Sequence, residues 1–229
     1  MSLDIVNPWP EVAKRQNPPY LAGCDKDIKF TDFYNLRLEL IPQPYLGNVS
    51  SAKVICLLLN PGCSSTEDSI ELNCQNLQQA LRENLSSTGT RLVHLDDEFD
   101  WTSGGEWIRR NILNPLSRHG VTRDDLNRNF AVVEYFPYHS KTFESRLKTP
   151  LESQQYSFAL VRQAIENGAI ILLMRGEKWW LKDVPELKAY RQTGNCIIPH
   201  STRSASLSEK NLGLENFAKV VRVLKTKLK

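Results

Sequence analysis

The stretch Val54-Ile-Cys-Leu-Leu-Leu-Asn60-Pro61-Gly62 decides the fold. Its apolar residues run without a break and end at a polar turn that contains a proline. A continuous apolar run, rather than an alternating one, is typical of a strand that is covered on both faces, as in a parallel sheet. Residues 54–59 are therefore predicted to form such a strand.

Three more apolar runs follow along the chain, at residues 130–135, 169–174 and 196–198. Segments with the apolar spacing of helices lie between and after these runs, at 70–85, 103–120, 157–167 and from 212 onward. The alternation of strand and helix is the pattern of a doubly wound layer. We predict an α/β fold with three layers, α/β/α, built around a short four-stranded parallel sheet.

The N-terminal segment has a different character. Its four prolines, at positions 8, 10, 18 and 19, predict an irregular chain, because proline fixes φ and lacks an N–H donor. Leucines at 36, 38 and 40 alternate with other residues and indicate a short strand, after which residues 42–47 are predicted to turn. We expect a single α/β domain over 1–229, with an irregular N-terminal wrap at 1–50 and a core at 51–229.

Composition and charge narrow the class of protein. Of the 229 residues, 41% are hydrophobic and 24% are charged, as in ordinary globular proteins. The net charge of +3 is only weak evidence for a nucleic-acid partner. The five cysteines form no Cys-x-x-Cys pair, which favours reduced thiols and a cytoplasmic location. The longest apolar run, 169–174, is too short to span a bilayer, so no membrane segment is expected.

The sequence carries no clear metal or cofactor motif. No Cys/His cluster has the spacing of a zinc site. The sequence has neither a phosphate-binding Gly-rich loop that ends in Lys-Ser/Thr nor the dinucleotide-binding motif Gly-x-Gly-x-x-Gly. The acidic run Asp96-Asp97-Glu98 with Asp100 could hold a metal, but such a run is more often a solvated loop. We expect no metal and no cofactor.

Polar residues follow each predicted strand. In doubly wound sheets, ligands bind outside the carboxyl ends of the strands. Here those ends are Asn60-Pro61-Gly62, Phe136-Pro-Tyr-His139-Ser140, Arg175-Gly176 and Pro199-His200-Ser201. The loop 96–105, with Phe99 and Trp101, is a candidate cover for the same edge.

Two of these segments carry the candidate catalytic residues. Asn60 sits in a rigid turn, and its amide cannot remove a proton but can hold and orient a water. His200 could donate a hydrogen bond to an oxygen that gains negative charge. The competing interpretation is an ordinary Asn-Pro turn for Asn60 and a solvated loop for His200.

The segment after the second predicted strand offers further candidates. Tyr138 could stack on a base, and His139 could hydrogen-bond to a phosphate or polarise a leaving group. His139 and Ser140 are a poor nucleophile–base pair, because adjacent residues of an extended chain point to opposite faces. Arg175 and Arg203 could bind anionic groups such as phosphates.

The order and spacing of these segments resemble the uracil-DNA glycosylase superfamily. The stretch 54–62 is similar to the first motif of its mismatch-specific and single-strand-selective branches. The stretches from Ile170 to Gly176 and from Ile198 to Ala205 are similar to its third strand and its second motif. The lead-in at 42–47 and the stretch 136–140 look like an uncharacterised branch, and the resemblance covers roughly residues 42 to 225.

The resemblance implies a fold, an activity and roles for named residues. The fold is a four-stranded parallel sheet between helices, and the reaction is hydrolysis of a base–sugar N-glycosidic bond in DNA after the nucleotide is flipped out. Asn60 would place the water, and His200 would stabilise the departing base. The base pocket would be formed by Pro61, Gly62, Tyr138 and His139. DNA would be bound by Ser140, Arg175, Ser201, Arg203 and Ser204, and Leu207 is a candidate for insertion into the duplex.

Two features leave an alternative open. The first motif lacks the Asp or Glu found in much of the superfamily, and the second strand presents no Asn to read a base. These departures favour, as the alternative, a non-catalytic nucleic-acid-binding or defence-associated protein that reuses the fold. A small-molecule N-glycoside or ester hydrolase that uses the same edge is a third possibility.

Overall fold

The computed structural model describes residues 5–27, 36–63, 71–87, 91–143, 150–202 and 205–227. A five-stranded sheet stands at its centre, in the order β1-β3-β2-β4-β5. The strands are β1 (Tyr45–Gly47), β2 (Val54–Leu58), β3 (Phe130–Glu134), β4 (Ile170–Leu173) and β5 (Cys196–Ile197). Each of the four predicted strands is present, within two residues of its predicted ends.

The number of strands in the prediction was wrong. Four strands, β3, β2, β4 and β5, are parallel, as expected, but β1 adds a fifth that runs antiparallel to β3. Tyr45 pairs with Val133 and Gly47 with Ala131, inside the segment predicted to turn. Of the leucines predicted to form a strand, Leu36 makes one isolated bridge, to Ser140, and the others are in no strand. The prolines at 42 and 44 concealed β1, because they signal a turn while the residues between Pro44 and Gly47 remain free to pair.

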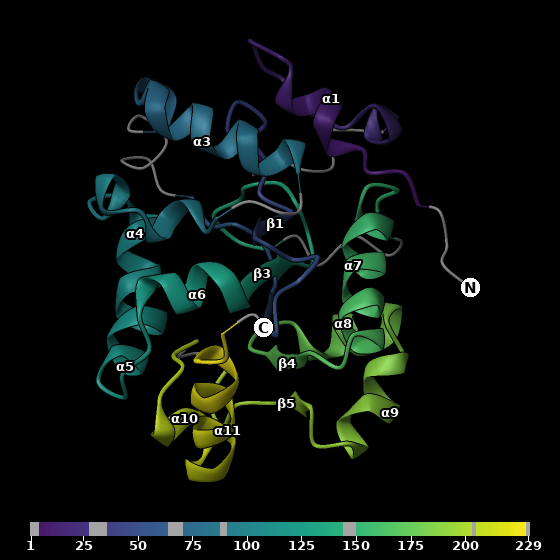
Figure 1. The fold of residues 1–229 in the computed structure, drawn as a ribbon. Coiled ribbons are helices and arrows are strands. Elements are labelled where there is room, and N and C mark those ends of the chain that lie inside the picture. Colours follow the sequence, from purple (N-terminus) through teal and green to yellow (C-terminus); the bar gives the residue numbers. More distant parts are fainter. Residues whose placement is uncertain are drawn as a thin grey trace.

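Helices cover the sheet. They are α1 (Trp9–Ala13), α3 (Gln75–Ser86), α4 (Ser103–Ile108), α5 (Asn114–Ser117), α6 (Arg123–Asn129), α7 (Gln154–Glu166), α8 (Glu177–Asp183), α9 (Glu186–Gln192), α10 (Glu209–Leu212) and α11 (Leu214–Leu224). Figure 1 shows α4, α5 and α6 on one side of the strands and α7, α8 and α9 on the other. A π-helical turn, Arg109–Leu113, joins α4 to α5. This is the predicted three-layer arrangement.

The N-terminal segment is not wholly irregular. It contains the short helix α1 and a 3₁₀ turn at Gly23–Asp25. Pro10 lies in the first turn of α1, where its missing N–H donor costs nothing. In Figure 1, α1 lies beside α3, beyond one end of the sheet.

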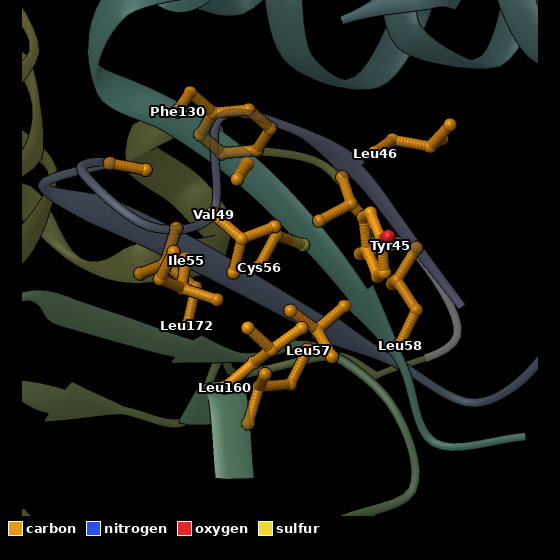
Figure 2. Close-up of a cluster of buried hydrophobic side chains, with 14 of the residues drawn as sticks. Tyr45, Leu46, Val49, Ile55, Cys56, Leu57, Leu58, Phe130, Leu160 and Leu172 are labelled. Atoms are coloured by element: carbon orange, nitrogen blue, oxygen red, sulfur yellow. The ribbon is translucent and has the colours of Figure 1, made fainter. Parts of the chain in front are cut away.

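The core explains why the strands read as continuous apolar runs. Residues Val54 to Leu57 of β2 are fully buried, because β2 has a neighbouring strand on each side and helices over both faces. Figure 2 shows side chains of β2 inside this core, with Leu57 beside Leu160 of α7. Burying one such side chain stabilises the fold by about 1.5–3 kcal/mol. No helix in the described part of the chain is long and apolar enough to cross a membrane.

Candidate active site

The carboxyl ends of the parallel strands meet at one edge of the sheet. The chain runs from β2 to β3 on one side of β2, and later to β4 on its other side. In doubly wound sheets such a reversal of direction marks the ligand site, which here falls between β2 and β4. Asn60 follows β2 and Arg175 follows β4, so the two residues flank this position.

The side chain of Asn60 is held by a network of hydrogen bonds. Its Nδ2 donates to the Ser140 Oγ at 3.0 Å, to the Ser140 carbonyl oxygen at 3.3 Å and to the Pro61 carbonyl oxygen at 3.0 Å. The Ser140 N–H donates to the Pro61 carbonyl oxygen at 3.2 Å and joins the two loops again. The loops that follow β2 and β3 are therefore fastened together at Asn60.

This network fixes which way the amide of Asn60 faces. The Ser140 hydroxyl donates its hydrogen bond to the Thr142 carbonyl oxygen at 2.9 Å. It can therefore only accept a hydrogen bond from Asn60. The other two partners are carbonyl oxygens, which also accept only. All three contacts thus require the NH₂ group of Asn60, and its Oδ1 points elsewhere. No described residue donates to that Oδ1.

Pro61 and Gly62 form the rest of the turn. Pro61 is buried and Gly62 is exposed. The φ of Gly62 is outside the left-handed region, and a Cβ on it would meet no atom of the described residues within 4 Å. Glycine is therefore not required here by the backbone or by its neighbours, and the space in front of it is open.

The ring of His139 contacts the backbone of the turn and of the segment before β1. Its Nδ1 lies 2.8 Å from the Gly62 carbonyl oxygen and its Nε2 lies 3.0 Å from the Ile41 carbonyl oxygen. The residue is 4% exposed. Both ring nitrogens face backbone acceptors, so in this structure His139 positions the turn and offers no nitrogen to a base or phosphate.

Tyr138 does not line a pocket. It is 1% exposed, its hydroxyl donates to the Asp25 Oδ2 at 2.6 Å, and the Ala22 N–H donates to that hydroxyl at 3.1 Å. Its ring meets Trp9 edge-on, with the centroids 6.0 Å apart. The N-terminal segment covers Tyr138, so the stacking role predicted from sequence has no exposed ring face here.

The residues after β4 and β5 reach the same edge but not the same network. Arg175, His200 and Ser201 are exposed. The His200 N–H donates to the Asn211 carbonyl oxygen at 2.8 Å, and the Ser201 N–H to the Asn211 Oδ1 at 2.8 Å. Since β4 stands between β2 and β5, His200 and Ser201 are separated from the Asn60 turn by two strand spacings, about 10 Å.

The remaining residues that the sequence predicted to contact DNA are Arg203, Ser204 and Leu207. Arg203 and Ser204 lie outside the described residues. Leu207 is fully buried, and its N–H donates to the Asn111 carbonyl oxygen at 2.8 Å, so it is not poised to insert between bases.

Glu134 is the residue of this edge that sequence reasoning missed. It ends β3, lies in register with Leu58 of β2 and is 6% exposed. Among the residues that the structure describes, its Oε2 has no hydrogen-bond partner. Burial raises the pKa of Glu134 to about 8, and the positive charge of Arg175 opposes part of that rise. A perturbed acid of this kind is typical of functional sites. The available signal was one acid at the end of an otherwise apolar run.

Gly104 of the loop 96–105 packs on His94, which is linked through Gln43 to the loop after β3. A Cβ on Gly104 would lie 2.5 Å from the ring of His94, so the two are in tight contact. The His94 Nε2 lies 3.2 Å from the Gln43 Oε1, and the Gln43 N–H donates to the Pro137 carbonyl oxygen at 3.0 Å. Burial lowers the pKa of His94 to about 4, and His139 nearby acts in the same direction.

The acidic run in this loop is occupied by arginines. Asp96 pairs with Arg91 at 3.0 Å, and Asp97 pairs with Arg123 at 2.8 Å. Asp100 pairs with Arg123 at 3.1 Å. Within the described ranges, no group of three or more His, Cys, Asp or Glu side chains is placed to hold a metal ion.

Two surface hollows lie elsewhere. One, of about 470 Å³, lies along α11 and is lined by His119, Phe217 and Val221 among others. The other, of about 540 Å³, is lined by Lys53, Asn167 and Gly168 among others, at the opposite edge of the sheet. Neither includes Asn60 or Glu134. We place the site at the carboxyl edge of the sheet because an oriented amide follows β2 there and a buried acid ends the neighbouring strand β3.

Comparison of the chain with protein-family models, with curated proteins and with solved structures gives no match.

Proposed function

We propose that this protein hydrolyses the N-glycosidic bond between a base and its sugar in DNA, in the manner of a uracil-DNA glycosylase. The observation that carries the proposal is the amide of Asn60. Three acceptors hold its NH₂ group, and its Oδ1 is left as an oriented acceptor at the strand reversal. Such an oxygen suits a water molecule, which donates two hydrogen bonds.

The chemistry asks little of Asn60 beyond placement. Hydrolysis of a glycosidic bond passes through a sugar cation of oxocarbenium character, so the water needs to be positioned more than activated. The water adds to the anomeric carbon as the bond to the base breaks. The base leaves with the bonding electrons, and the water loses a proton to solvent or to the base. Open space in front of Gly62 gives the sugar room to approach.

A nucleic-acid substrate fits the exposed groups at this edge. Arg175 and Lys141 are exposed on the loops after β4 and β3, beside the Asn60 turn. Basic side chains at such a place would contact phosphates and position the strand. His200 and Ser201 would join them once a flipped nucleotide spans the distance between β2 and β5.

The test is base release from oligonucleotides, single-stranded and duplex, that carry uracil, hypoxanthine, xanthine or a mismatch. Release that depends on Asn60 supports the proposal, and the panel names the base. Binding that strengthens at low salt without release of any base would support the non-catalytic alternative instead. Turnover of free nucleosides without DNA would point to the small-molecule hydrolase.

A further inference from the structure

The carboxyl of Glu134 is an unexplained group at this edge. Glu134 ends β3 and lies opposite Leu58 of β2. Leu58 comes two residues before Asn60 in the chain. The Oε2 of Glu134 is buried, and no residue that the structure describes donates a hydrogen bond to it. Buried polar atoms are almost always paired in native proteins, and an exception calls for a bound molecule or a functional role.

The surroundings of Glu134 favour its uncharged form. The charged or titratable groups that interact with it are Arg175 and Cys56. Burial outweighs the pull of Arg175 and raises the pKa of Glu134 to about 8. At neutral pH the group is then mainly a carboxylic acid, with an O–H donor beside a C=O acceptor.

The O–H donor and the C=O acceptor of a carboxylic acid match a ligand that presents one acceptor beside one donor. A lactam edge, such as that of uracil or hypoxanthine, presents one N–H beside one C=O, and it can exchange two hydrogen bonds with a carboxylic acid. Enzymes that flip a base read its Watson–Crick edge in this way. A carboxylate, which only accepts, would meet the lactam oxygen with repulsion.

We propose that Glu134 is the specificity-determining residue of the site and that it reads the lactam edge of a nucleobase through its carboxylic acid. The inference rests on the proposed function, because it takes the ligand of this edge to be a base. It assigns the recognition role to an acid at the end of β3 and names lactam bases as the substrate class.

The experiment compares the wild-type protein with Glu134→Gln and Glu134→Leu across pH 6–9, using oligonucleotides that carry uracil or hypoxanthine. Gln keeps one donor and one acceptor but does not titrate, whereas Leu keeps neither. The wild-type rate of base release should fall about tenfold per pH unit above about 8. Glu134→Gln should show no such fall, and Glu134→Leu should lose about 100-fold or more at pH 7. Glu166→Gln, an exposed acid at the end of α7, is the matched control.

The outcomes separate this inference from the proposed function. If Asn60→Ala loses base release while wild type and Glu134→Gln share one pH profile, the glycosylase stands and the role of Glu134 is overturned. If no oligonucleotide is cleaved, free uracil and hypoxanthine are titrated against ¹⁵N-labelled protein. Resonance shifts that weaken at high pH in wild type but not in Glu134→Gln support the inference, and their absence overturns it. Because Gln replaces Glu almost isosterically, a failure of Glu134→Leu to fold leaves the pH comparison intact.

Discussion

Asn60 and Ser140 are eighty residues apart in the chain, and the Asn60 Nδ2 donates to the Ser140 Oγ across 3.0 Å. The contact fastens the loop after β2 to the loop after β3. It also sets the direction of the amide, because the Ser140 hydroxyl donates its hydrogen bond to the Thr142 carbonyl oxygen and can only accept one from Asn60. The orientation of the Asn60 amide therefore depends on a contact between the loops after β2 and β3.

Ser140→Ala should loosen the orientation of the Asn60 amide while the fold of the two loops is kept. The variant removes one of three acceptors that hold the Asn60 amide and leaves two carbonyl oxygens in place. We expect the free energy of unfolding to fall by about 1 kcal/mol. We expect kcat for base release to drop with little change in KM, since the bond orients a group and does not touch the substrate. Urea unfolding and steady-state kinetics measure the two effects. A raised KM at constant kcat would contradict the positioning role.

His94 should make the fold sensitive to mild acid. Burial lowers the pKa of His94 to about 4, whereas an unfolded histidine titrates near 6.5. Its contribution to stability is complete above about pH 6.5 and is lost as the pH falls toward 4, by up to about 1.4 kcal/mol per pH unit. His94→Gln should remove that part of the slope. Urea unfolding of both proteins at several pH values checks this, and parallel curves would contradict it.

Glu134 should act on stability with the opposite sign. Its pKa is raised to about 8 in the folded protein, so the folded state holds a proton that the unfolded chain releases near 4.5. Its contribution is complete below about pH 4.5 and declines as the pH rises toward 8, by up to about 1.4 kcal/mol per pH unit. Glu134→Gln should be more stable relative to wild type at pH 8 than at pH 5. A difference that stays constant with pH would show that the group does not titrate in this range.

Gly105 in α4 and Gly62 in the Asn60 turn should respond differently to substitution by alanine. A Cβ on Gly105 would lie 2.1 Å from the Phe99 backbone oxygen, so Gly105→Ala forces the backbone to move and should cost about 1–3 kcal/mol. A Cβ on Gly62 meets nothing, so Gly62→Ala should stay within about 0.5 kcal/mol of wild type. Thermal unfolding compares the pair. Equal losses of stability in both variants would contradict the described packing.

Much of the fold could be predicted from sequence. The four parallel strands are nearly continuous apolar runs, because both of their faces are covered, and that signal is local and strong. Strand β1 was missed because Pro42, Pro44 and Gly47 dominate the local pattern, whereas its pairing with β3 is made about ninety residues away.

The candidate site was only partly predictable for the same reason. The position of the turn that contains Asn60 follows from the strand that precedes it. Its fastening to Ser140 depends on a long-range contact that no periodicity reports. Tyr138 was assigned to the base pocket because it follows a strand, but Asp25 and the N-terminal segment bury it. Glu134 gave a weak signal, because one acid at the end of an apolar run is also what a solvated strand end looks like.

If Asn60 holds the water that cleaves the N-glycosidic bond, its loss should slow base release in a single-turnover measurement. Base release is followed for wild type, Asn60→Ala and Asn167→Ala, an exposed asparagine at the opposite edge of the sheet, on whichever oligonucleotide the wild type cleaves. We expect Asn60→Ala to slow release by about 10²–10⁴-fold with unchanged DNA binding and folding, and Asn167→Ala to match wild type. Release by Asn60→Ala at the wild-type rate would contradict this role of Asn60.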